Sequence, residues 1–311
     1  MPGSIPRIFA VSMAAVVVSC TPSMIRPPAD TASPPAVSPR TDLAPIPRRG
    51  GYATADDGAR IYYEVCGSGP AMVFVHGLGG NHAVWFQQVA HFSVDHTVVT
   101  MSQRGFAPSG GDQDDYDVDL LVRDLEDVMR AAGVERGVVI GQSMGGWTAL
   151  AIALHSPERV EALVLADTLG GIHDAEIADQ MRAVGASAAR LRSEPPPLGV
   201  HPALAASFSR RRPDLAYLYQ TLTTFGAPAP DSIVKQLFAT RVTPERLRTL
   251  QVPTLFIVGS EDTLFPPPLI RKAAAHIPGS HVKVIADSGH SPYFEQPAAW
   301  NAALTGFLGR R

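Results

Sequence analysis

Short apolar runs alternate along the chain with stretches whose apolar residues have helical spacing. Seven runs predict strands, at residues 59–67, 71–77, 96–101, 137–142, 160–167, 253–259 and 281–287. Most of these runs lack polar alternation, as strands that are buried on both faces do. Residues 119–133 place apolar side chains on one helix face and stop at Gly133. Strands that alternate with helices predict a mostly parallel, doubly wound α/β sheet.

The alternation is interrupted between residues 169 and 250, where no convincing buried strand occurs. Helical spacing is found there instead, in residues 174–191, in residues 213–225 and in residues 230–239. A helical insertion of this size between two strands predicts a cap. We therefore expect one folded domain at residues 51–311, with the cap at about 169–250.

The first twenty residues have the pattern of an export signal. Arg7 precedes an apolar stretch, Ile8 to Val18, that is too short to span a bilayer as a helix. It has the length of a signal-peptide core. The ending Val17-Val18-Ser19-Cys20 resembles a bacterial lipobox, which implies removal of residues 1–19 and lipidation of Cys20. An ordinary secretory leader and an uncleaved anchor remain open alternatives.

Residues 20–50 follow as a proline-rich segment. Proline fixes φ and has no N–H, so eight prolines between residues 21 and 50 predict an extended, disordered linker. The leader and linker together predict an exported protein. The lipobox implies attachment to the membrane through Cys20; without it the protein would be secreted or periplasmic.

Composition narrows the classes of partner. The chain of 311 residues has a formal net charge of −3, and no basic run indicates a nucleic-acid partner. Two cysteines allow at most one disulfide. No Cys/His cluster has metal-ligand spacing, and no glycine-rich loop for a phosphate or dinucleotide has a convincing context. We therefore expect neither a metal nor a cofactor.

Ser143 lies in the sequence Gly-Gln-Ser-Met-Gly, where the run 137–142 meets a helical stretch. Gly-x-Ser-x-Gly at a strand-to-helix junction is the nucleophile elbow, a turn so sharp that side chains at Gly141 and Gly145 would clash. The turn would raise the serine hydroxyl above the sheet.

A serine nucleophile needs a base, and the base needs an acid. His290 is the histidine that follows the last predicted strand and precedes the last helix. Asp262 lies just past the strand at 253–259 and is the favoured acid. Asp167, at the end of the strand at 160–167, is its rival.

An acyl-transfer enzyme also needs N–H donors for the oxyanion. The glycines of "HGLGG", residues 76–80, let the chain bend after a strand. The expected donors are the backbone amides of Leu78 and Met144, the latter following the nucleophile.

These motifs stand in the order Ser, Asp, His, and the chain from residue 52 to 311 resembles the α/β-hydrolase superfamily. Its members with a helical cap include esterases, lactonases and carbon–carbon bond hydrolases. The resemblance implies a triad of Ser143, Asp262 and His290. One motif departs from the family: the usual aspartate after the fourth strand is Ser102 in "SQRGFAPS", while Arg104 is retained. This loop shapes the site entrance in relatives, so the departure bears on the substrate.

The resemblance implies a serine hydrolase that cleaves a small or medium carboxylic ester or lactone through an acyl-enzyme. The same triad also serves carbon–carbon bond hydrolases and cofactor-free perhydrolases of the haloperoxidase kind. Outside enzymes, the fold serves as a ligand-binding receptor. Aromatic side chains of the cap either line an apolar pocket or pack between helices: Phe208, Tyr217, Tyr219, Phe225 and Phe238.

Overall fold

A computed structural model of the chain describes residues 45–111, 117–182, 199–225 and 231–310. The expected leader, Cys20 and most of the expected linker lie outside these residues, as does the second half of the helix expected at 174–191. Within the described ranges, none of the helices has the length and apolar character needed to cross a bilayer.

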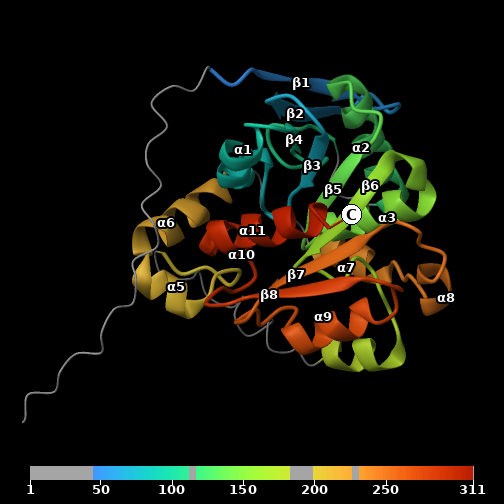
Figure 1. Ribbon diagram of the computed structural model, residues 1–311, viewed down its shortest axis with the longest axis vertical. Coiled ribbons are helices and arrows are strands. Elements are labelled where there is room, and N and C mark those ends of the chain that lie inside the picture. Colours follow the sequence, from blue (N-terminus) through green and yellow to red (C-terminus); the bar gives the residue numbers. More distant parts are fainter. Residues whose placement is uncertain (1–44, 112–116, 183–198, 226–230, 311) are drawn as a thin grey trace, which may run out of the picture. The chain divides into compact units, whose positions relative to one another are not determined.

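Eight strands form one sheet in the order β1-β2-β4-β3-β5-β6-β7-β8 (Figure 1). The strands are β1 (Arg48–Thr54), β2 (Arg60–Cys66), β3 (Ala71–Val75), β4 (Thr97–Met101), β5 (Gly137–Gln142), β6 (Val160–Ala166), β7 (Thr254–Gly259) and β8 (His281–Ile285). The pairs β1–β2 and β2–β4 are antiparallel, and all later pairs are parallel. The expected mostly parallel α/β sheet is confirmed.

The sheet separates two apolar cores because successive side chains of a strand point to opposite faces. Val73 and Val75 of β3 belong to one core, whereas Met72 and Phe74 belong to the other. The central strands are therefore buried on both faces, and this burial explains their unbroken apolar runs.

Helices cover both faces of the sheet. The helices outside the cap are α1 (Phe86–Phe92), α2 (Val118–Ala132), α3 (Gly145–His155), α9 (Pro267–Ala274), α10 (Pro292–Glu295) and α11 (Pro297–Leu308), with short 3-10 helices η1 (His82–Trp85) and η2 (Pro157–Arg159). Side chains of α2, α3 and α9 join the first core, and those of α1, α10 and α11 join the second. The predicted face of α2 is buried, and the helix ends at Gly133 in a left-handed conformation with φ 75°.

The cap contains more helices than the sequence pattern predicts. Residues 175–182 are helical and are followed, beyond a gap in the described residues, by α5 (Ala206–Arg211), α6 (Pro213–Leu222), α7 (Asp231–Ala239) and α8 (Pro244–Leu247). The pattern predicted α6, α7 and the helix at 175–182, but not the short helices α5 and α8. An isolated bridge between Ile172 and Val242 is the sole β-pairing described between residues 169 and 250.

The N-terminal boundary also differs from the expectation. Strand β1 begins at Arg48, so the sheet starts before residue 51. The sequence "RRGGYAT" has two glycines and little apolar character, so its pattern gave no indication of a strand. It pairs with β2 along its whole length as an edge strand, where only one side needs a partner.

A buried ion cluster fixes the loop "SQRGFAPS" after β4. The Arg104 guanidinium donates through Nε and Nη2 to both carboxylate oxygens of Asp124 in α2, at 2.9 and 2.7 Å. Its Nη1 donates to Asp57 at 2.6 Å. Arg104 and Asp124 are buried, whereas the side chain of Asp57 is 49% exposed. The loop is therefore joined to α2 and to the β1–β2 turn by one guanidinium.

We predict that Arg104→Ala lowers the free energy of unfolding by about 3–5 kcal/mol, because Asp124 remains as a buried charge without its partner. Asp57→Ala removes a half-exposed partner and should cost about 1 kcal/mol or less. Denaturant unfolding of both variants measures the difference. Equal losses would contradict the assignment of Asp124 as the dominant partner.

Candidate active site

Four neighbouring strands bring the candidate residues to one edge of the sheet. Strands β5, β6, β7 and β8 are adjacent and parallel, so their carboxyl ends lie together. Ser143 follows β5, Asp167 follows β6, and the loops after β7 and β8 carry Asp262 and His290. The carboxyl edge of such a sheet is where α/β proteins place their ligands.

The turn at Ser143 has the geometry of a nucleophile elbow. Ser143 has φ 48°, a left-handed conformation that costs a non-glycine residue about 1–3 kcal/mol. A Cβ at Gly141 would lie 2.3 Å from the carbonyl oxygen of Gly145, and a Cβ at Gly145 would lie 2.4 Å from that of Val75. Both flanking positions therefore require glycine, as the sequence predicted.

Ser143, His290 and Asp262 form a hydrogen-bonded chain. Nε2 of His290 lies 2.9 Å from Oγ of Ser143, and Nδ1 of His290 lies 2.9 Å from Oδ2 of Asp262. His290 and Asp262 are buried, and Ser143 is half-buried. The serine is therefore the member of the chain that reaches solvent.

The surroundings of Asp262 determine the tautomer of His290. Oδ1 of Asp262 accepts the N–H groups of Leu264 and Phe265 at 2.8 and 3.0 Å. A carboxylate that accepts on both oxygens requires a proton on Nδ1 of His290. Nε2 then has a free lone pair, which accepts the hydroxyl proton of Ser143.

Asp167, the rival acid, does not contact His290 in this way. Its Oδ1 accepts the N–H of Gly259 at 2.9 Å, and its Oδ2 is buried without a hydrogen-bond partner among the described residues. Burial and the adjacent charge of Asp262 raise the pKa of Asp167 well above its usual range. The structure thus pairs His290 with Asp262 and places Asp167 close to both.

The two expected oxyanion donors lie beside the nucleophile. A Cβ at Gly77 would lie 3.0 Å from Cβ of Ser143, so the backbone that leads to Leu78 runs directly past the elbow. The N–H groups of Leu78 and Met144 have no acceptor among the described residues. An unpaired N–H at this position is available to a negative oxygen.

His76 and Gln103 hold this loop from behind, a role that sequence reasoning did not assign. Nε2 of His76 accepts the N–H of Gln103 at 2.9 Å, so Nδ1 carries the proton and donates to the carbonyl of Gly77 at 2.7 Å. Burial lowers the pKa of His76 to about 4, so the ring is neutral. Gln103 also donates to the carbonyl of His76 and accepts from Thr148. The loop that contains Ser102 therefore supports the backbone segment that leads to Leu78.

Glu295 and Gln142 hold the loop that carries His290. Oε1 of Glu295 accepts the N–H groups on both sides of the histidine, from Gly289 at 2.9 Å and Ser291 at 3.2 Å. Nε2 of Gln142 donates to the carbonyl of His290 at 2.9 Å. Burial raises the pKa of Glu295 to about 7. Glu295 stands in the same motif as His290, and that proximity was the available indication of its role.

The cap is joined to the same loops. Oε2 of Glu295 accepts the N–H of Ala205 at 2.9 Å, just before α5, and Ser207 in α5 donates to Glu261. The hydroxyl of Tyr219 in α6 lies 2.8 Å from Oγ of Ser291. This side of the cap is therefore built onto the residues that flank His290.

Two of the five cap aromatics take the expected packing role. Phe208 and Tyr219 are buried and stack edge to face on Phe294, so they pack between helices. Tyr217, Phe225 and Phe238 are exposed. The ring of Phe265 lies 5.5 Å from that of His290, and it provides an apolar wall beside the site.

Among the described residues, Asp167, Asp262 and His290 form the one cluster with metal-ligand chemistry, with one ligand atom of each lying within 4.8 Å of the others. Two of its members hydrogen-bond to each other, and Asp262 accepts two further N–H groups. The cluster is therefore arranged as a hydrogen-bond chain, with few lone pairs left for an ion.

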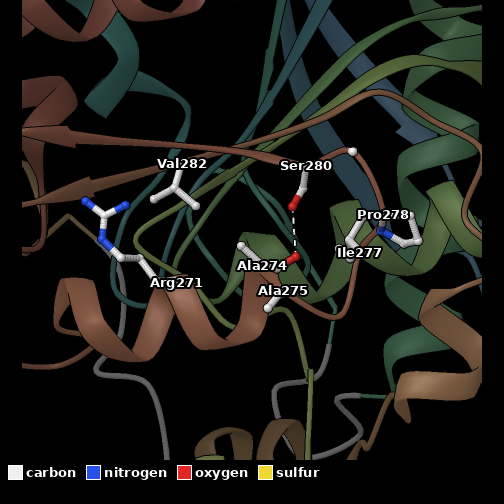
Figure 2. Close-up of a pocket in the computed structure, with 8 residues that line it drawn as sticks. Arg271, Ala274, Ala275, Ile277, Pro278, Ser280 and Val282 are labelled. Atoms are coloured by element: carbon white, nitrogen blue, oxygen red, sulfur yellow. Dashed lines mark hydrogen bonds between the residues drawn. The ribbon is translucent and has the colours of Figure 1, made fainter.

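Two surface hollows lie outside the site. One lies between α9 and β8 and has a volume of about 430 Å³. Its lining residues, drawn in Figure 2, are Arg271, Ala274, Ala275, Ile277, Pro278, Gly279, Ser280 and Val282. Ser280 already donates to the carbonyl of Ala274 there. A second hollow of about 400 Å³ lies beside β2 and α1. Neither is lined by Ser143, Asp262 or His290.

Residues 70–297 match the family model described as the alpha/beta hydrolase fold. The chain belongs to this family. It is therefore a hydrolase by family, and its eight-stranded, mostly parallel sheet is that of the alpha/beta hydrolase fold.

Curated relatives of this family cover most of the chain. It is 27% identical over 267 residues to "Putative carbamate hydrolase RutD" of Azorhizobium caulinodans, which covers 83% of this chain and 98% of the relative. It is 28% identical over 250 residues to 3-oxoadipate enol-lactonase 2 of Acinetobacter baylyi, over 78% of this chain and 89% of the relative.

A solved structure is also similar. A thermophilic esterase from Thermogutta terrifontis superposes with a TM-score of 0.68 at 27% identity, covering 85% of this chain and 98% of that one. This esterase therefore shares the fold of the chain.

Glu295 gives the stability of the protein a pH dependence. Its folded pKa of about 7 lies above the ordinary value of 4.5, so the folded state binds this proton more tightly than the unfolded state. Stability from this group is therefore present below about pH 4.5 and is lost as the pH rises to about 7. Glu295→Gln carries no such proton, so its stability deficit should shrink by about 2–3 kcal/mol between pH 5 and pH 8.

Denaturant unfolding of wild type and Glu295→Gln at both pH values measures this change. A deficit that is the same at pH 5 and pH 8, or that grows with pH, would show that Glu295 is ionised throughout.

Proposed function

We propose that this protein is an exported serine hydrolase that cleaves small or medium carboxylic esters or lactones through an acyl-enzyme. The observation that supports this most directly is the position of His290, with Nε2 2.9 Å from Ser143 and Nδ1 2.9 Å from Asp262. A histidine that accepts from a serine and donates to a carboxylate is the arrangement that makes a serine hydroxyl nucleophilic.

In the first half of the reaction, Oγ of Ser143 attacks the substrate carbonyl and its proton passes to Nε2 of His290. Asp262 accepts from Nδ1 and stabilises the imidazolium that forms. The N–H groups of Leu78 and Met144 donate to the oxyanion of the tetrahedral intermediate. His290 then returns the proton to the leaving alcohol, and Ser143 holds the acyl group.

In the second half, His290 takes a proton from water, which attacks the acyl carbonyl. The same two N–H groups stabilise the second oxyanion. Its collapse breaks the bond to Oγ of Ser143, which regains the proton from His290. Each side chain leaves the cycle in the state in which it entered, so these residues complete the hydrolysis without a further reagent.

Two named relatives support an ester or lactone as the substrate class: the enol-lactonase of Acinetobacter baylyi and the esterase of Thermogutta terrifontis. A solved structure titled "Est816 as an N-Acyl homoserine lactone degrading enzyme" agrees, with a TM-score of 0.67 at 26% identity over 82% of this chain and 99% of that one. Phe265 and the exposed side chain of Leu78 give the site apolar surfaces, which suit an acyl chain.

The sequence of the N-terminus supports the location. We propose that residues 1–19 are a leader, that Cys20 is the lipidated N-terminus, and that the proline-rich segment links it to the domain. A single acyl chain anchors a protein only marginally, whereas two or more hold it stably. The enzyme would then work at the cell envelope.

We predict that Ser143→Ala lowers the hydrolysis of p-nitrophenyl butyrate at least about 100-fold, because Ser143 is the serine that His290 contacts through Nε2. The fold should be unaffected, since alanine removes one hydroxyl. Ser280→Ala, which alters a serine in the hollow of Figure 2, should retain wild-type activity. Retained hydrolysis in Ser143→Ala above about one hundredth of wild type would reject the assignment.

A fluorophosphonate label and a substrate panel separate the alternatives. Wild type should be labelled at Ser143 and should turn over esters of graded acyl length or lactones. Preference for a carbamate, a carbon–carbon bond or peracid formation would move the protein to another hydrolase class. Binding without any turnover would indicate a receptor-like module.

We predict that Cys20→Ser releases the protein from the membrane fraction or blocks its processing, while the activity of the folded domain is unchanged. Cys66→Ser is the matched control, because Cys66 is buried in β2, and it should leave the location unchanged. Intact mass spectrometry of the membrane extract reads the modification. An unmodified Cys20, or a mature chain that starts elsewhere, would reject lipidation and leave ordinary secretion as the remaining alternative.

A further inference from the structure

A second carboxyl group lies close to the Asp262–His290 pair. Asp167 follows β6 and Asp262 follows the adjacent β7, and both side chains are buried. One oxygen of each and a ring nitrogen of His290 lie within 4.8 Å of one another. Two carboxylates this close in a buried site cannot both be ionised, so one of them retains a proton.

The hydrogen bonds show which group keeps the proton. Asp262 accepts three donors, from His290, Leu264 and Phe265. Asp167 accepts one, from Gly259, and its Oδ2 is buried with no partner among the described residues. Donors stabilise a carboxylate, whereas an orphaned buried oxygen penalises it. The charge therefore resides on Asp262 and the proton on Asp167.

We propose that Asp167 is a neutral positioning residue whose carboxylic O–H donates to the Asp262 carboxylate, so that the pair holds one proton and one negative charge behind His290. The role deepens the proposed function and rests on it, because it acts through the same histidine. The donated bond satisfies the orphaned Oδ2 and gives the Asp262 carboxylate one more donor.

Two further observations support this assignment. Burial, followed by the charge of Asp262, raises the pKa of Asp167 well above its usual range. Asp167 also has φ 47°, a conformation that is costly for most residues but tolerated by Asp, Asn and Gly. The backbone at the end of β6 is thus held in the conformation that presents this carboxyl.

Several titratable groups act on this pair. Those that influence Asp167 include Asp262, His290, Glu295, Tyr219 and Tyr293. His201 of the cap is neutral near pH 7, since burial and then His290 lower its pKa to about 4. None of these groups supplies a positive charge to Asp167 while His290 is neutral, so nothing among them favours its ionisation.

The consequence for His290 concerns its imidazolium form. A hydrogen bond donated to Asp262 withdraws part of its negative charge, and a weaker carboxylate stabilises imidazolium less. Asp167 would therefore limit the support that Asp262 gives to the imidazolium of His290. The acid limb of the pH profile of kcat/KM reports protonation of the catalytic base in the free enzyme.

Two substitutions of Asp167 test the proposal on the acid limb, with p-nitrophenyl butyrate as substrate. Asp167→Asn keeps an N–H donor and a neutral side chain, so the acid limb should stay within about 0.3 pH unit of wild type. Asp167→Gly keeps the backbone conformation and removes the donor, so the limb should rise by about 0.5–1 unit.

The opposite result is equally clear. If Asp167 were ionised, Asp167→Asn would remove a negative charge beside His290 and lower the acid limb by about 1 unit or more. That fall, or an unshifted limb in Asp167→Gly, would overturn the proposal.

An infrared measurement tests the protonation without any activity. The difference spectrum of wild type minus Asp167→Asn at pH 8 should contain a carboxylic-acid C=O band. The same band should appear when both proteins of the comparison also carry Ser143→Ala. A carboxylate band in its place would overturn the proposal. Glu295, which is partly protonated near pH 7, is present in both proteins and cancels. If the enzyme hydrolyses no ester but the acid band is present, the proposed function fails and the protonation of Asp167 stands.

Discussion

The close contact of Gly141 with Gly145, and of Gly145 with the backbone of β3, is the constraint on which the site depends. Those contacts let β5 turn into α3 within three residues and hold Ser143 at φ 48°. The N–H of Ser143 still pairs with the carbonyl of Ala166, so the nucleophile is attached to the sheet rather than to a loop. Its position is therefore as rigid as the core beneath it, which serves a group that must meet a carbonyl within a few tenths of an ångström.

The partners of Ser143 lie on longer loops, and buried hydrogen bonds replace the rigidity that the sheet gives the serine. Glu295 holds the peptide groups on both sides of His290, and Gln142, the residue before the nucleophile, holds its carbonyl. Because Glu295 also binds the backbone before α5, the cap and the histidine loop share one anchor. A displacement of this part of the cap would therefore also disturb the loop that holds the base.

The sequence predicted the features that a local pattern identifies. Gly141 and Gly145 identify the elbow because the turn allows nothing larger, and the apolar runs identify the buried strands because both faces are covered. Long-range partners were not predictable. Nothing near Glu295 in the sequence shows that Ala205 lies against it, and nothing near Arg104 shows Asp57 or Asp124. Strand β1 was missed because an exposed edge strand needs neither apolar continuity nor alternation.

The choice between Asp262 and Asp167 shows the same limit in the site itself. Both follow a strand, and adjacent parallel strands end side by side, so sequence position makes either one a plausible acid. The difference comes from donors: the turn after Asp262 directs two backbone N–H groups at its carboxylate, whereas Asp167 receives one. Backbone amides thus decide which carboxyl carries the charge. Asp167 then takes the role of a neutral hydrogen-bond donor. Two carboxyl groups can therefore lie close to one histidine while only one negative charge is buried.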